Sequence, residues 1–212
     1  MSVIDKGEMN VHRTGGGRLS PPGRRRNVEV RPREYLTIQE VERLLAAVGS
    51  HGRKRLRNRL LILMLFSHGL RVSEACELRW GQIDLENQEI YVRRKKNGKP
   101  AVHPLRREEI DLLCDFCRIP PASQWVFCSE REAGKPMTPS NVRKIVFAAG
   151  QRAGFHYPLH PHQLRHACGY YLASRGFDTR LIQDYLGHRQ IRHTVLYTEL
   201  APGRFKGIWE EP

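Results

Sequence analysis

Four side chains in the last third of the chain belong to residue types that can act on a phosphate. They are His162, Arg165, His188 and Tyr197. A guanidinium group can pair with two phosphate oxygens, an imidazole can move protons near neutral pH, and a phenol can act as a nucleophile. The alternative, which the residues taken alone favour, is an ordinary solvated basic face.

A helix is expected over residues 161–174, because apolar side chains recur there at helical spacing. This stripe consists of Leu164, Cys168, Tyr171 and Leu172. His162, Arg165 and His166 then share a separate polar face, above which Gly169 leaves room for a phosphate.

The two remaining side chains follow a second expected helix, which begins after Asp178 and ends at Gly187. His188 would lie in the turn after this helix, where a histidine can also cap the helix dipole without any chemistry. Tyr197 falls on a short element before Pro202, and its alternative role is that of a core tyrosine.

The folded part is expected to begin at Leu36, since Thr37 and Glu40 have the spacing of a capping box. An apolar helix over about 56–67 must be central in the core. Arg71 then begins a short helix reaching about residue 78, and its place near a helix N-terminus favours contact with an anion.

The pattern changes to a hairpin in the middle of the chain. Residues 89–93 alternate as a strand, Asn97-Gly98 is a typical hairpin turn, and residues 101–105 return as the paired strand. Lys96 stands beside the turn, where spacing alone favours an exposed lysine without chemistry.

Further elements are expected to be mostly helical. The patterns indicate helices over 107–117 and 138–153 and a short edge strand over 125–127. Basic residues of the second helix are candidates for contacts with a nucleic-acid backbone or groove: Arg143, Lys144 and Arg152. The predicted fold class is therefore mainly α with one small antiparallel β-sheet.

The composition favours a polyanionic partner. The 212 residues include 36 Lys and Arg against 22 Asp and Glu, which gives a formal charge of +14. Residues 1–34 are rich in Gly, Arg and Pro and lack an apolar period, so they are predicted to form a flexible basic arm. Residues 35–212 form one predicted domain, with a C-terminal tail from about residue 203.

Neither a membrane segment nor a secretory signal is predicted, so the expected location is cytoplasmic. Five cysteines without such a signal indicate reduced thiols. Cys114 and Cys117 form a CxxC, but their spacing also suits a buried helix stripe. A metal could instead bind His162 and His166, which would leave Tyr197 without a role.

The motifs taken together resemble the tyrosine recombinase (phage integrase) family. The resemblance rests on His162-x-x-Arg165-His166, on Leu186-Gly187-His188 with Tyr197 nine residues later, and on the upstream segment 69–74, Gly-Leu-Arg-Val-Ser-Glu. Residues 178–188 and 203–209 are similar to the short recombinases that invert fimbrial promoter elements for phase variation.

This resemblance implies a catalytic set and a reaction without a cofactor or metal. The implied catalytic residues are Arg71, Lys96, His162, Arg165, His188 and Tyr197. Lys95 competes with Lys96 for the role of general acid. The implied partner is double-stranded DNA carrying recombination sites, bound by a homotetramer on two sites. The alternative is a DNA-binding regulator that has the fold without the catalysis, and a zinc-dependent nucleic-acid enzyme is a third possibility.

Overall fold

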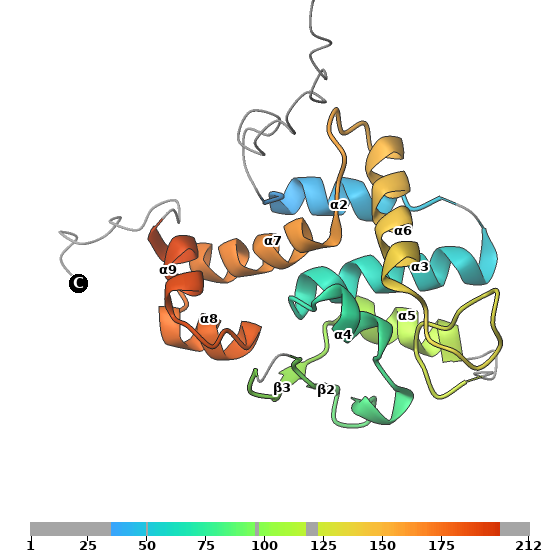
Figure 1. Cartoon of the computed structure of the whole chain (residues 1–212), viewed down its shortest axis with the longest axis horizontal. Coiled ribbons are helices and arrows are strands. Elements are labelled where there is room, and N and C mark those ends of the chain that lie inside the picture. The colour runs from blue at the N-terminus through green and yellow to red at the C-terminus, as the bar shows by residue number, and fades with distance from the viewer. Residues whose placement is uncertain (1–34, 50, 96–97, 118–122, 200–212) are drawn as a thin grey trace, which may run out of the picture.

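The computed structural model describes residues 35–49, 51–95, 98–117 and 123–199, and in this part the protein is mainly helical with a small sheet (Figure 1). The predicted arm, Lys96, Asn97, Pro202 and the predicted tail lie outside these residues. The helices are α2 (Ile38–Ala46), α3 (Gly52–Ser67), α4 (Val72–Cys76), η1 (Trp80–Gln82), α5 (Arg107–Cys117), α6 (Pro139–Arg152), α7 (Pro161–Ser174), α8 (Thr179–Leu186) and α9 (Arg192–Glu199). The strands are β1 (Ile83–Asp84), β2 (Glu89–Val92) and β3 (Ala101–Pro104).

Helix α3 is the centre of the core, as its composition predicted. Every side chain from Leu60 to Phe66 is buried, and the helix packs against α2, α4, α5 and α7. It begins at Gly52, earlier than the predicted start near residue 56. Its first turns carry charged and exposed residues, so they lack the apolar period from which a helix start is inferred.

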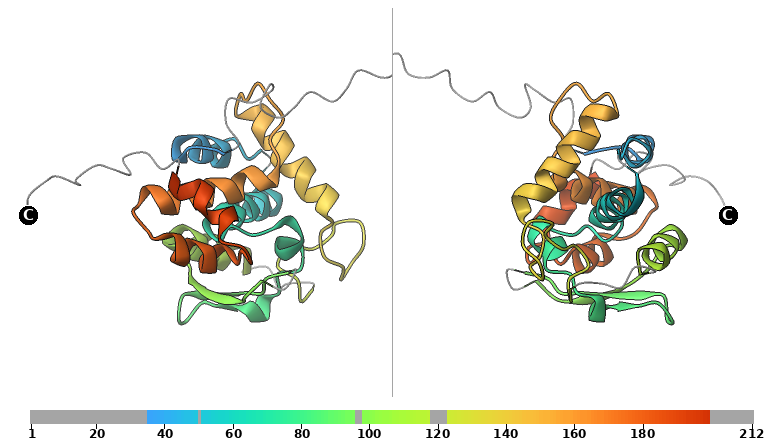
Figure 2. Two further views of the ribbon diagram at one scale, coloured as in Figure 1. Left: turned by 60° about the vertical axis from the view of Figure 1, so that its left-hand side comes forward. Right: turned by 90° about the vertical axis from the view of Figure 1, so that its right-hand side faces the viewer.

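The sheet is antiparallel in the order β1-β2-β3 and lies along one edge of the helical body (Figure 2). The hairpin strands pair as predicted, with Ile90 opposite His103. Strand β1 has only two residues and was not predicted.

The short edge strand predicted over residues 125–127 is wrong. Trp125 forms only an isolated bridge with Arg79, and Val126 donates one backbone hydrogen bond to Leu78. Val126 and Phe127 are nevertheless buried. The apolar run therefore fills the core without forming a strand. A buried strand would need a similar apolar run, so the pattern of residues alone does not separate the two.

The local signals at the helix ends are confirmed. The Thr37 backbone N–H donates to Glu40 Oε2 at 2.8 Å and the Glu40 backbone N–H donates to Thr37 Oγ1 at 3.3 Å, so both halves of the predicted capping box are present. The Asp178 carboxylate accepts from two backbone N–H groups at the start of α8. Gly187 ends this helix with φ of 64°, a left-handed conformation that favours glycine.

The CxxC is not a buried stripe. Cys114 is exposed and Cys117 is half-buried, whereas the buried face of α5 is formed by Leu112, Leu113 and Phe116. Across the described ranges, no three His, Cys, Asp or Glu side chains are grouped so that they could hold a metal ion. Nor does any helix in those ranges have the length and apolar character needed to cross a bilayer.

Candidate active site

Arg165 lies inside the protein, so the face of α7 that carries it is not a solvated basic face. The residue is only 1% exposed. Its Nη1 donates to the Gly69 carbonyl oxygen, and its Nη2 donates to the Leu186 carbonyl oxygen at 2.6 Å. Burial, together with the charges of Arg71 and Arg94, lowers the pKa of Arg165 to about 10, and the guanidinium therefore stays charged at neutral pH.

Arg71 approaches the same place from the other side. It precedes α4, its Nη1 pairs with Glu74 at 2.7 Å, and its Nη2 donates to the Gly187 carbonyl oxygen at 3.5 Å. Gly187 follows Leu186, to which Arg165 donates. The loops at residues 69–71 and 186–188 thus bring the two guanidinium groups together, and the side chain of Arg71 is still 25% exposed.

A hollow of about 320 Å³ opens beside Arg71. It is lined by Leu70, Arg71, Val72, Ser73, Pro139, Arg143, Pro161 and His162. Because Arg71, Arg143 and His162 can all be positively charged or donate hydrogen bonds, the hollow suits an anionic group.

Glu74 and Arg94 organise this region, and sequence reasoning assigned neither of them a role. Glu74 accepts from the Arg71 backbone at 2.9 Å, from Arg94 at 3.0 Å and from the Lys95 backbone at 3.1 Å. Burial alone would raise the pKa of the Glu74 carboxyl, but the charge of Arg94 and these donors hold it below its ordinary value. The spacing of Glu74 from Arg71, that of a capping box, was an available signal.

Arg94 ties the hairpin to the loop after α3 and to the last turn of α8. Its side chain is fully buried, and it donates to the carbonyl oxygens of His68, Gly69 and Tyr185. Arg94 continues the alternation of the buried Ile90 and Val92, so the strand period was an available signal that distinguishes it from the exposed Arg93. Its contacts anchor the chain just after strand β2.

His188 lies where the sequence predicted it, in the turn after α8. Its Nδ1 is 2.9 Å from the Thr194 hydroxyl, and Thr194 is fully buried. Burial and the charges of Arg165 and Arg71 lower the pKa of His188 to about 3, so the ring is neutral at neutral pH. Since Thr194 engages Nδ1, the Nε2 side of the ring is the one available to a ligand.

Tyr197 is buried against α7, on the same face as Arg165. Its ring lies over Gly169, where an added Cβ would be 2.5 Å from Tyr197 Cε2. The His188 ring lies 6.1 Å away, centroid to centroid. Burial raises the pKa of Tyr197 to about 12, while the charges of Arg165 and Arg71 oppose this shift.

The Tyr197 hydroxyl is hydrogen-bonded to His166, which the predicted catalytic set did not include. The distance from the hydroxyl to His166 Nδ1 is 2.9 Å. His162, predicted to lie near Tyr197, is exposed and packs edge-to-face on His166 with ring centroids 4.4 Å apart. Five of the six predicted residues therefore surround one region, and the sixth, Lys96, lies outside the described residues.

The contact between Gly169 and Tyr197 leads to a first prediction. In Gly169→Ala the new methyl group would overlap the phenol ring, so we expect Tyr197 to shift. The DNA cleavage that the family resemblance implies should then slow by about 10²-fold in a single turnover. Alanine is favoured over glycine in a helix by about 1 kcal/mol, which opposes the cost of moving the ring, so the melting temperature should change little. Gly81→Ala, which meets open space, is the matched control. Normal cleavage by Gly169→Ala would contradict the tight packing.

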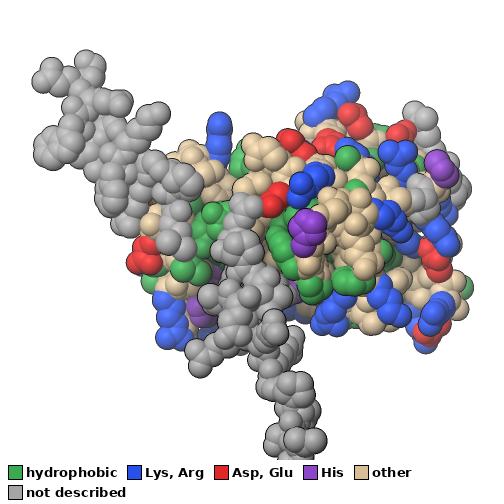
Figure 3. Space-filling view, turned by 90° about the horizontal axis from the view of Figure 1, so that it is seen from above, with side chains coloured by type: hydrophobic (Ala, Val, Ile, Leu, Met, Phe, Trp, Pro, Cys, Tyr) green, Lys and Arg blue, Asp and Glu red, His purple; other side chains and the backbone are tan. Residues whose placement is uncertain are grey.

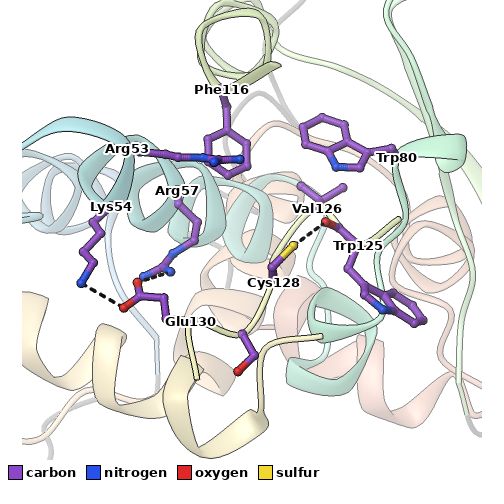
Figure 4. Close-up of a pocket in the computed structure, with 10 residues that line it drawn as sticks. Arg53, Lys54, Arg57, Trp80, Phe116, Trp125, Val126, Cys128 and Glu130 are labelled. Atoms are coloured by element: carbon purple, nitrogen blue, oxygen red, sulfur yellow. Dashed lines mark hydrogen bonds and ion pairs between the residues drawn. The ribbon is translucent and has the colours of Figure 1, made fainter. Parts of the chain in front are cut away.

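A second hollow lies at the end of the molecule where α3 begins (Figure 4). It has a volume of about 410 Å³ and is lined by aromatic rings and by the ion pairs of Lys54 and Arg57 with Glu130. None of the predicted catalytic residues that the structure describes lines it. Figure 3 shows Lys and Arg side chains interspersed with Asp and Glu over the half of the molecule that includes this end.

Comparison with known proteins identifies the family. The chain is 46% identical over 183 residues to the type 1 fimbriae regulatory protein FimB of Escherichia coli K12, and 44% identical over 186 residues to FimE of the same strain. The matches cover 84% of this chain in both cases and 90% of FimB and 91% of FimE.

A solved structure has the same fold. The XerH site-specific recombinase in its post-cleavage complex with a palindromic difH substrate superposes with a TM-score of 0.69 at 28% identity. This match covers 84% of the chain but 53% of the XerH chain, so the present chain spans about half of that protein's length. The predicted fold class is confirmed. A family model described as the phage integrase family matches residues 34–204, and the chain therefore belongs to the phage integrase family of tyrosine recombinases.

Proposed function

We propose that this protein is a site-specific recombinase that cuts and rejoins double-stranded DNA through a 3′-phosphotyrosine intermediate on Tyr197. The observation that carries the proposal is the packing of the Tyr197 ring on Gly169, one helical turn from the buried Arg165. The Tyr197 phenol and the permanent positive charge of Arg165 therefore lie at one face of α7. Arg71 reaches the same region from the loop before α4.

Arg71 and Arg165 can offset the negative charge that makes a phosphodiester resist attack. A phosphodiester repels nucleophiles, and the five-coordinate transition state carries still more negative charge. Arg165 uses one N–H each from Nη1 and Nη2 to hold carbonyl oxygens, and a guanidinium has five N–H donors in all. The remaining donors, with those of Arg71, would bind the non-bridging oxygens in a water-poor site.

The step is a transfer of the phosphoryl group. The Tyr197 oxygen attacks phosphorus, the bond from phosphorus to the 5′ oxygen breaks, and the leaving oxygen takes a proton from Lys96 acting as general acid. His188 donates a hydrogen bond from Nε2 to a non-bridging oxygen, because Thr194 engages its other nitrogen. His162 is assigned a part in proton transfer near Tyr197, the role that the family resemblance implies.

Religation reverses this chemistry on another strand. The 5′ hydroxyl of a partner strand attacks the phosphotyrosine, and Tyr197 leaves as a phenol. The bond energy is kept in the ester, so no nucleotide cofactor is required. Two DNA sites and four protomers, exchanging strands in pairs, are the assembly proposed for this reaction.

The biological outcome that we propose is inversion of a DNA segment that controls fimbrial gene expression. Support comes from the relatives FimB and FimE, which are named as type 1 fimbriae regulatory proteins and match nearly their whole length. The basic composition of the chain supports binding to DNA.

The test is to incubate the protein with a nicked suicide duplex that carries its own recombination site. We expect a protein–DNA adduct that survives denaturation, forms in the presence of EDTA, and maps to the tryptic peptide containing Tyr197. Specific DNA binding without any adduct would instead identify the non-catalytic regulator. An adduct that EDTA abolishes would favour a metal-dependent enzyme.

A further inference from the structure

The side chain that touches the nucleophile is His166. The Tyr197 hydroxyl lies 2.9 Å from His166 Nδ1, and the two rings meet edge to face with centroids 5.8 Å apart. His166 follows Arg165 on α7 and precedes Gly169 by nearly one turn. The helix therefore places a proton acceptor beside the phenol and a permanent cation within the same turn.

We propose that His166 is a further catalytic residue, and that its Nδ1 accepts the proton of Tyr197 when the phenol attacks DNA. The inference rests on the proposed function, because it requires Tyr197 to be the nucleophile. It adds an acceptor between the phenol and His162, which the motifs placed near Tyr197.

The resting state of the pair suits this role. Burial lowers the pKa of His166 to about 4, and the nearby His162, Arg165 and His160 also disfavour its charged form. The ring is therefore neutral at neutral pH and retains one nitrogen lone pair. With its proton on Nε2, Nδ1 accepts the hydrogen bond that the Tyr197 hydroxyl donates. The phenol, with its pKa near 12, keeps its proton in this state.

Binding of DNA changes the balance between the two groups. A phosphate in the hollow beside Arg71 and His162 brings a negative charge, which favours the protonated, charged form of the His166 ring. As the bond from the Tyr197 oxygen to phosphorus forms, that oxygen loses its affinity for the proton. The proton then moves to Nδ1, and the bond to the 5′ oxygen breaks on the other side of phosphorus.

His162 completes a path from the phenol to solvent. It is exposed, and its ring centroid is 4.4 Å from that of His166. The protonated His166 can return its proton to Tyr197 during religation, or pass it outward by way of His162. Proton transfer by a positioned side chain contributes about 10²- to 10⁴-fold to a rate.

The decisive variant is His166→Asn, because asparagine places an acceptor oxygen near the position of Nδ1 but cannot take up a proton. We expect single-turnover cleavage of the suicide duplex to slow by about 10²- to 10³-fold, with unchanged DNA binding and an unchanged thermal melt. The matched control is His156→Asn, which alters an exposed histidine in the loop before α7 and should cleave normally. Cleavage by His166→Asn within threefold of wild type would overturn the proposal.

A second measurement needs no DNA and no variant activity. Nitrogen-15 NMR of labelled wild-type protein, with His166 assigned by its loss in His166→Asn, reports which ring nitrogen carries the proton. We expect an unprotonated Nδ1 at pH 7. A protonated Nδ1 would mean that His166 donates to the phenol oxygen and only positions it, and this would overturn the inference.

The outcomes separate this inference from the proposed function. Suppose that wild type and His156→Asn form the adduct on Tyr197 and that His166→Asn forms it equally fast. That result would support the proposed recombinase and contradict the proposed role of His166. If wild type forms no adduct, the proposed function is wrong, and the inference about His166, which depends on it, is wrong as well.

Discussion

Replacing Tyr197 with phenylalanine is expected to abolish the covalent protein–DNA adduct while the protein still folds and binds its site. The phenol oxygen is the only atom removed, and in the resting protein it forms a hydrogen bond with His166. Loss of one such bond should lower the free energy of unfolding by about 1 kcal/mol. Denaturing gel electrophoresis after incubation with the suicide duplex measures the adduct.

The matched control for this variant is Tyr185→Phe. Tyr185 is a partly buried tyrosine, and its hydroxyl donates to the Ser67 carbonyl oxygen at 2.8 Å. It therefore tests the loss of a hydrogen-bonded phenol hydroxyl that is not the proposed nucleophile, and its adduct should form. An adduct in Tyr197→Phe would mean that another side chain attacks the DNA.

Replacing Arg165 with lysine should remove both activity and stability. An ammonium group lacks the planar fork that reaches the carbonyl oxygens of Gly69 and Leu186 together, so at least one buried acceptor loses its partner. We expect the cleavage rate to fall on the order of 10²- to 10³-fold. The free energy of unfolding should fall by about 2 kcal/mol, as measured by urea denaturation.

Arg71→Lys is the matched comparison, because Arg71 is partly exposed where Arg165 is buried. Its cleavage rate should fall by a similar factor, whereas its unfolding midpoint should stay close to that of wild type. Equal destabilisation by the two variants would contradict the structural difference between the arginines. Normal cleavage by either variant would remove that arginine from the proposed site.

Several elements could be predicted because short-range physics decides them. The helix over 161–174 was placed correctly from its apolar spacing and its flanking residues. Asp178 and Gly187 bounded α8 as predicted, since a carboxylate that accepts from backbone N–H groups and a glycine with positive φ act within one turn. The burial of residues 60–66 followed from an apolar run too long for a surface helix.

Other features required contacts between distant segments. Tyr171 was predicted on the buried stripe of α7 but is 39% exposed, and Arg165 was predicted on a polar face but is fully buried. Helical spacing gives the angle between side chains but does not say which face meets a neighbour. Here α9 covers the polar face, and the loops after α3 and α8 supply the acceptors that make a buried guanidinium stable.

The sequence by itself determined the family, the residue types of the site and their order along the chain, because the motifs at 69–74, 162–166, 186–188 and 197 are each local. Only the tertiary structure decided which histidine touches the Tyr197 hydroxyl. His162 and His166 are one turn apart on the same helix, so their spacing treats them alike. The choice between them is made by the packing of Tyr197 on Gly169, a contact across 28 residues that no local pattern encodes.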